Sequence, residues 1–188
     1  MPYIDDDDDM KIADGAVSRK RHEDGADAAA RQFLTQKSSG NIDKARRLGG
    51  DYARTILDIG SHPELVSRES TMLETHHQLL LCAYIVNRVI AGLSPDSILA
   101  QTSLGSFYAD VAAIAPHVYS HISDMAAFSL YILNERTGNP DEEIGKIYAR
   151  LSGFEGDQTK IDDGNRIYAR FHAFCADMMD KAGYAAVE

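Results

Sequence analysis

The longest helical pattern of hydrophobic and polar positions runs from residue 64 to residue 93. In its second half, residues 79–93, only Asn87 and Arg88 are strongly polar. A helix that is apolar on nearly all sides belongs in the middle of a bundle. The stretch is too short and too interrupted to span a bilayer, which takes about 20 apolar residues. The pattern therefore predicts a central, buried helix over about 64–93.

Other helical patterns lie on both sides of this one, separated by glycine and proline. They cover residues 28–37, 42–59, 95–115, 116–136, 140–152 and 159–182. Asp27, Asn41 and Ser94 precede three of them and are predicted as N-caps, because their side-chain oxygens can accept hydrogen bonds from free backbone N–H groups. No strand pattern is found, so the sequence predicts an all-α fold.

One of these patterns contains Gly49 and Gly50, and it allows two interpretations. The apolar stripe from Ile42 to Ile59 keeps its phase through both glycines, which indicates one continuous helix with a small, closely packed patch. Each glycine costs about 1 kcal/mol in a helix interior, which favours two short helices with Asp51 as the second cap. Both interpretations stay open at this point.

The domain organisation follows from the loops and from the charge at the start of the chain. Residues 1–13 contain five consecutive acids, Asp5 to Asp9, and mutual repulsion predicts a flexible, solvated tail. The loops between the remaining helices are short, so neighbours should be mostly antiparallel. Residues 14–188 are therefore predicted to form a single-domain bundle of six or seven mostly antiparallel helices around the central one.

Composition excludes several classes of partner. The net charge is −10, which argues against nucleic acid, because binding there depends largely on neutralised phosphates. It argues equally against an anionic membrane surface. The chain begins with acids where a secretory signal would be basic and then apolar. Its two cysteines, Cys82 and Cys175, lie in apolar helical patterns typical of buried, reduced thiols. We expect a cytoplasmic protein.

The first candidate for chemistry is the pair His117 and His121. The two are four residues apart in the predicted helix 116–136, so both rings project from one face and could share a metal ion. Asp124 lies on the same flank. No glutamate follows the first histidine, so the zinc-protease motif is absent. The alternative is that both histidines lie at the bundle surface, hydrogen-bonded to water or backbone carbonyls.

The second candidate is the pair His76 and His77 on the central helix. Both share faces with apolar residues, and burial would lower the pKa of an imidazole and keep it neutral, able to act as a ligand or a base. The alternative is a core histidine with a backbone or hydroxyl partner. If both candidates faced one cavity, His117 and His121 could hold a metal ion together with His77 or, alternatively, His76. Asp124 or Glu74 would then orient a ligand or act as a base.

Three tyrosines, at positions 52, 148 and 168, each precede Ala-Arg. Tyrosine and arginine are enriched at interaction hot spots, so these residues could form a binding surface. Alternatively, they lie at the edge of the core, each with its hydroxyl at the rim.

No phosphate-binding loop, dinucleotide fingerprint or hydrolase nucleophile elbow is found in the sequence. By elimination, it predicts a protein–protein interaction or regulatory module without a cofactor, whose partner is not specified and which is compatible with a homo-oligomer. The alternative is a metal-binding helical protein or metal-dependent enzyme, with a divalent transition metal held by histidines from two helices.

Overall fold

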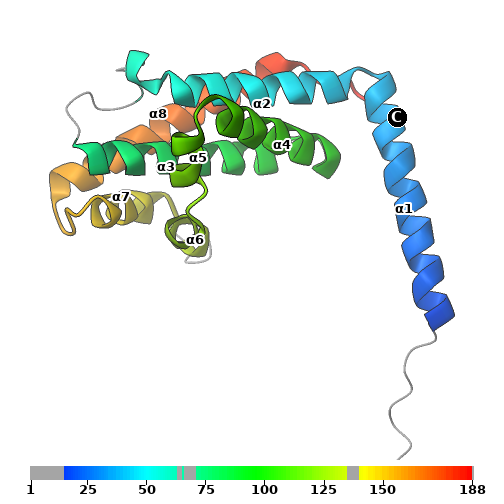
Figure 1. The fold of residues 1–188 in the computed structure, drawn as a ribbon, viewed down its shortest axis with the longest axis horizontal. Helices are drawn as coiled ribbons and strands as arrows, with labels where there is room; N and C mark the ends of the chain where they lie inside the picture. The colour runs from blue at the N-terminus through cyan, green and yellow to red at the C-terminus, as the bar shows by residue number, and fades with distance from the viewer. Residues whose placement is uncertain (1–14, 63–64, 66–70, 135–139, 188) are drawn as a thin grey trace, which may run out of the picture.

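The computed structural model describes residues 15–62, 65, 71–134 and 140–187. Within these ranges the fold is all-α, as predicted, with no strand, and the helices follow one another as shown in Figure 1. They are α1 (Gly15–Ser38), α2 (Asn41–Leu57), the short 3-10 helix η1 (Ile59–Ser61), α3 (Met72–Leu93), α4 (Ser97–Ile114), α5 (Pro116–Ile122), α6 (Met125–Asn134), α7 (Pro140–Leu151) and α8 (Gln158–Ala182).

The described residues contain eight α-helices where six or seven were predicted. The pattern over 116–136 forms two helices rather than one, because Asp124 accepts hydrogen bonds from the backbone N–H groups of Ala126 and Ala127 and so starts α6. Helix α1 begins at Gly15, which places Asp27 inside the helix rather than at its cap. The predicted tail of residues 1–13 lies outside the described residues.

Helix α3 begins later than predicted. Thr71 and Glu74 form a capping box, in which the Thr71 hydroxyl accepts from the Glu74 N–H and the Glu74 carboxylate accepts from the Thr71 N–H. This reciprocal pair satisfies two backbone donors and sets the start of the helix. Leu65 lies in a turn, and residues 66–70 are outside the described ranges. Similarly, Asp96 rather than Ser94 caps α4.

The core is built around α3, which packs against α2 and against α4 to α8. All residues of α3 from Gln78 to Val86 are buried. Cys82 and Cys175 are buried free thiols, as predicted, and burial raises the pKa of each thiol. Among the described helices, none has the length and hydropathy of a bilayer-spanning segment.

Helix α2 is continuous through its two glycines, which decides between the two interpretations above. A Cβ atom added at Gly49 would lie 2.2 Å from the backbone oxygen of Ser103 in α4. The missing side chain therefore lets α2 and α4 approach closely, and this gain in packing offsets the helix-propensity cost of glycine.

Helices α2, α3 and α4 reverse direction one after the other, so α2 and α4 run the same way (Figure 1). Gly49 lies beside Ser103 and Phe107, and Gly50 lies beside Asp110, so contacts advance together along both helices. Helices α3 and α8 also run in the same direction (Figure 1). A short loop favours an antiparallel arrangement only for the two helices that it connects, and the most extensive contact here joins α2 and α4, which are not consecutive.

Candidate functional site

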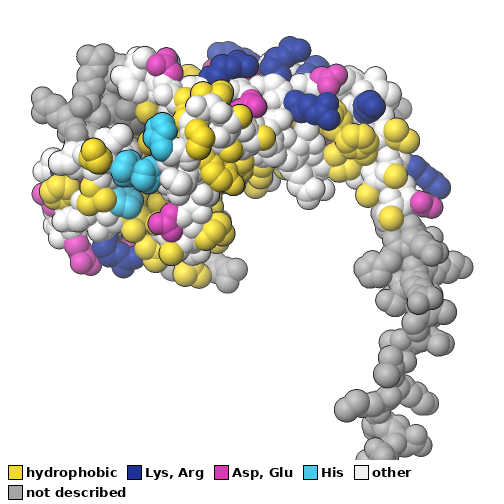
Figure 2. All heavy atoms as spheres, in the orientation of Figure 1, with side chains coloured by type: hydrophobic (Ala, Val, Ile, Leu, Met, Phe, Trp, Pro, Cys, Tyr) yellow, Lys and Arg dark blue, Asp and Glu magenta, His cyan; other side chains and the backbone are white. Residues whose placement is uncertain are grey.

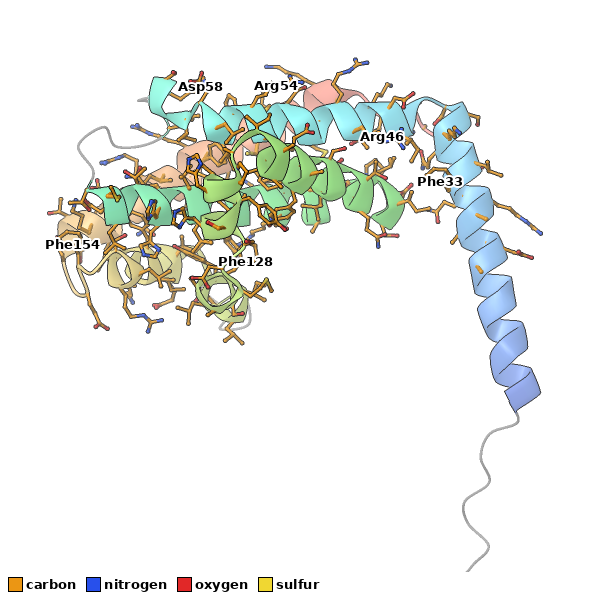
Figure 3. The ribbon with its side chains drawn as sticks, viewed as in Figure 1. Phe33, Arg46, Arg54, Asp58, Phe128 and Phe154 are labelled. Carbon is orange, nitrogen blue, oxygen red and sulfur yellow. The ribbon has the colours of Figure 1, made fainter. Side chains whose placement is uncertain are left out.

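Helix α1 projects away from the bundle (Figure 1). Its only extensive helix–helix contact, among the described residues, is with α2. Phe33 and Leu34 are 38% and 62% exposed, and Ala26, Ala29 and Ala30 are exposed on the same side at spacings of three and four. Figure 3 shows that Phe33 projects into the angle between α1 and the bundle. We call these five residues the α1 edge.

A polar junction fixes the direction of α1. The Asn41 side-chain amide donates to the Gln36 side chain at 2.7 Å and to the Ala185 carbonyl at 2.8 Å, and its oxygen accepts from the Ala185 N–H at 2.8 Å. Gln36 in turn donates to the carboxylate that caps α4, that of Asp96. Gln36 and Asn41 are buried, so losing one partner would leave an unsatisfied group, which costs roughly 1–3 kcal/mol.

This junction changes the role that the sequence suggested for Asn41. Asn41 is the first residue of α2 and not its side-chain cap, because Gly40 precedes the helix with a φ of 77°. The amide of Asn41 instead connects the α1–α2 corner to the C-terminal residues. Sequence reasoning missed the junction because its members are far apart in the chain. Nothing in the sequence next to Gln36 or Asn41 indicates that their side-chain amides are buried.

The two histidine pairs do come together. Figure 2 shows histidines gathered on one face of the bundle, over α3 and α5. The ring of His76 in α3 stacks on the ring of His121 in α5, with centroids 3.7 Å apart and planes inclined by 21°. His117 lies close enough to influence the His76 ring, and His77 lies close to His121 and to Asp124. We call these four histidines the histidine cluster.

Two members of the cluster have a lowered pKa. Burial lowers the pKa of His76, and the neighbouring His121 and His117 lower it further. Burial also lowers the pKa of His77, with a smaller contribution from His76, while the Asp124 carboxylate opposes the shift. Proton uptake would place like charges beside each other, so the packing of α5 on α3 favours neutral rings.

The present geometry does not suit a shared metal ion. An imidazole nitrogen binds a metal in the plane of its ring, and two nearly parallel rings 3.7 Å apart do not direct their nitrogens to one point. Within the described part of the chain, no group of three or more His, Cys, Asp or Glu side chains is placed to hold a metal. The metal interpretation of His77, His117 and His121 stays a prediction.

The two acids predicted to assist a metal have structural roles. Asp124 caps α6 through two backbone N–H groups. Glu74 pairs with the Lys160 ammonium of α8 and closes the capping box of α3. Burial alone would raise the pKa of Glu74, but the hydrogen bonds from Lys160 and Thr71 outweigh it and lower the pKa. Glu74 is therefore held as a structural carboxylate.

The tyrosines that precede Ala-Arg belong to the core rather than to a binding surface. Tyr52, Tyr148 and Tyr168 are all buried, and the Tyr52 hydroxyl donates to the Cys175 carbonyl at 2.7 Å. Arg88, the polar interruption in α3, places its guanidinium over the Tyr168 ring at 5.6 Å.

Comparison of the chain with models of known protein families, with curated proteins and with solved structures finds no match.

Proposed function

We propose that this protein is an interaction module that uses α1 as a docking arm. The observation that carries the proposal is the exposure of the α1 edge on a helix that leaves the bundle. An isolated helix is only marginally stable in water, and most helical stability comes from packing of an apolar face. A projecting helix with an Ala, Phe and Leu edge gains that packing when a partner covers it.

The residues around the edge suggest the chemistry of the partner. Arg31 and Lys37 are exposed on α1 near Phe33 and Leu34, so an apolar groove with acidic residues at its rim would match both kinds of side chain. Docking of such an edge follows the helix-in-groove mode, in which anchors recur at spacings of three and four.

A rough energy indicates how extensive the contact must be. Full burial of a Phe or Leu side chain contributes about 1.5–3 kcal/mol, and Phe33 and Leu34 are already partly covered. Together they would contribute about 2–4 kcal/mol, which is less than the entropy lost on association. The partner must therefore also contact the alanines and the charged residues along α1.

The test is site-specific photocrosslinking in cells. A photoreactive phenylalanine analogue at position 33 is expected to give a discrete adduct, identified by mass spectrometry. The matched control carries the analogue at Ile114, which is 64% exposed at the end of α4, and should give no such adduct. Adducts of equal yield at both positions, or none at position 33, would overturn the proposal.

A second candidate function, metal binding, has one observation in its favour, the gathering of four histidines. It would need the stacked rings of His76 and His121 to rotate apart, so that imidazole nitrogens converge to about 4 Å from one another. The stacked arrangement makes this the less favoured of the two functions.

A further inference from the structure

A small cavity lies between α2 and the C-terminal end of α8, close to the α1–α2 corner. Its volume is about 260 Å³, and seven residues line it. Three of these are apolar and at least half-buried: Leu48, Met178 and Ala182. The other four are charged: Lys44, Arg47, Lys181 and Asp51. We call this site the α2–α8 cavity.

The cavity carries an excess of positive charge. Asp51 pairs with Arg54 at 2.5 Å, and Lys181 pairs with Asp177 at 2.5 Å, so these charges largely cancel. Lys44 donates to the neutral Gly183 carbonyl, and Arg47 forms no ion pair with any described residue. Two uncompensated positive charges therefore remain, on a chain whose net charge is −10. Figure 2 shows Lys and Arg side chains gathered along the outer side of α2.

An acidic ligand with an apolar group would complement this cavity. The acid groups would pair with Lys44 and Arg47, and the apolar group would cover Leu48 and Met178. The chain itself contains such a segment outside the described residues. It consists of Asp5–Asp9, flanked by Ile4 and Met10.

The length of α1 decides whether this segment belongs to the same copy. A helix rises about 1.5 Å per residue, so the 24 residues of α1 place Gly15 about 36 Å from the α1–α2 corner. Gly15 is ten residue steps from Asp5, and a fully extended chain spans at most about 35 Å over ten steps. The middle of the acidic run reaches only about 28 Å. While α1 is helical, the run cannot cover the cavity of its own copy.

We propose that the α2–α8 cavity binds the Asp5–Asp9 segment of a second copy of this chain. The interaction is head-to-tail, since the donor segment and the acceptor cavity are different surfaces, and it generates rings or open chains of copies. This inference goes beyond the proposed function, because it assigns a partner to a surface other than the α1 edge.

The test uses two variants of the full chain that each keep one half of the interaction. The donor variant, Lys44→Gln with Arg47→Gln, loses the basic side of the cavity and keeps the Asp5–Asp9 segment. The acceptor variant replaces each of Asp5–Asp9 with Asn and keeps the cavity intact. A control variant, Lys146→Gln with Arg150→Gln, removes two exposed bases from α7, which lies on the other side of the bundle from α2 (Figure 1). Circular dichroism checks that all three are folded.

Sedimentation velocity measures the self-association of each variant. The native chain and the control variant should self-associate, and raising the salt to about 0.5 M should weaken that association at least about tenfold, because screening is strong between exposed charges. Each of the other two variants alone should be monomeric. An equal mixture of them should form a 1:1 heterodimer, since one intact segment and one intact cavity remain.

Three results would overturn the inference. They are a native chain that stays monomeric at low salt, variants that self-associate like the native chain, and a mixture that stays monomeric. None of these depends on crosslinking at position 33, so the proposed role of α1 and this inference can fail independently.

Discussion

The close approach of α2 and α4 at Gly49 gives the sharpest test of the fold. Gly49→Ala would place a methyl group 2.2 Å from the Ser103 carbonyl oxygen, 2.8 Å from the Ser106 Cβ and 2.9 Å from the Phe107 nitrogen. Two of these three atoms belong to the α4 backbone, which cannot rotate away as a flexible side chain can. The helices must therefore move apart, and the packing along both is reduced.

The magnitude follows from two opposing terms. Overpacking of a core contact costs about 1–3 kcal/mol, and a clash with backbone belongs at the upper end of that range. Replacing a helical glycine by alanine returns about 0.5–1 kcal/mol through helix propensity. The net loss in the free energy of unfolding is about 2 kcal/mol, which lowers the melting temperature by about 4–8 °C for a chain of this length.

Urea denaturation followed by circular dichroism measures this loss, and Gly105→Ala is the matched control. Gly105 lies in α4, and a Cβ atom added there meets no other atom within 4 Å. This variant should gain about 0.5–1 kcal/mol from helix propensity alone. A Gly49→Ala variant as stable as the native chain, or an equal loss in the free energy of unfolding for both variants, would contradict a tight contact between α2 and α4 at Gly49.

Three further predictions concern the sites. His76 has a folded-state pKa below its ordinary value of 6.5, so the unfolded chain takes up more protons below about pH 6.5 and stability falls as the pH drops through that window. His76→Gln should lose less stability than the native chain between about pH 7.5 and 5.5, as measured by urea denaturation at each pH. Lys160→Met removes the cation that pairs with buried Glu74 and should cost about 2–4 kcal/mol at neutral pH, because the carboxylate is left without its counter-ion. Protein purified without chelators or nickel resin should be metal-free by mass spectrometry, since the rings of His76 and His121 are stacked.

Each of these predictions can be contradicted. An unchanged acid sensitivity in His76→Gln would show that the histidine cluster does not contribute to the pH dependence. A Lys160→Met variant as stable as the native chain would mean that solvent compensates Glu74. Near-stoichiometric zinc, iron or manganese, lost in His121→Ala, would favour the metal interpretation over the stacked arrangement.

The sequence alone determined where most helices begin and end. Pro116 and Pro140 start helices, and Gly40 and Gly183 follow helix ends with positive φ angles. These signals are local, because they depend on the backbone preferences of single residues. The central position of α3 could also be predicted from the sequence, since a helix with so few polar positions has to be surrounded by other helices.

The tertiary structure decided which faces meet. Periodicity groups Phe33 and Leu34 on one side of α1, but whether another helix covers that side depends on the direction that the Asn41 junction imposes. The spacing of His117 and His121 predicted a shared face, yet only the packing of α5 on α3 set His121 against His76. Such contacts join residues far apart in the chain, and the local preferences that position helices carry no information about them.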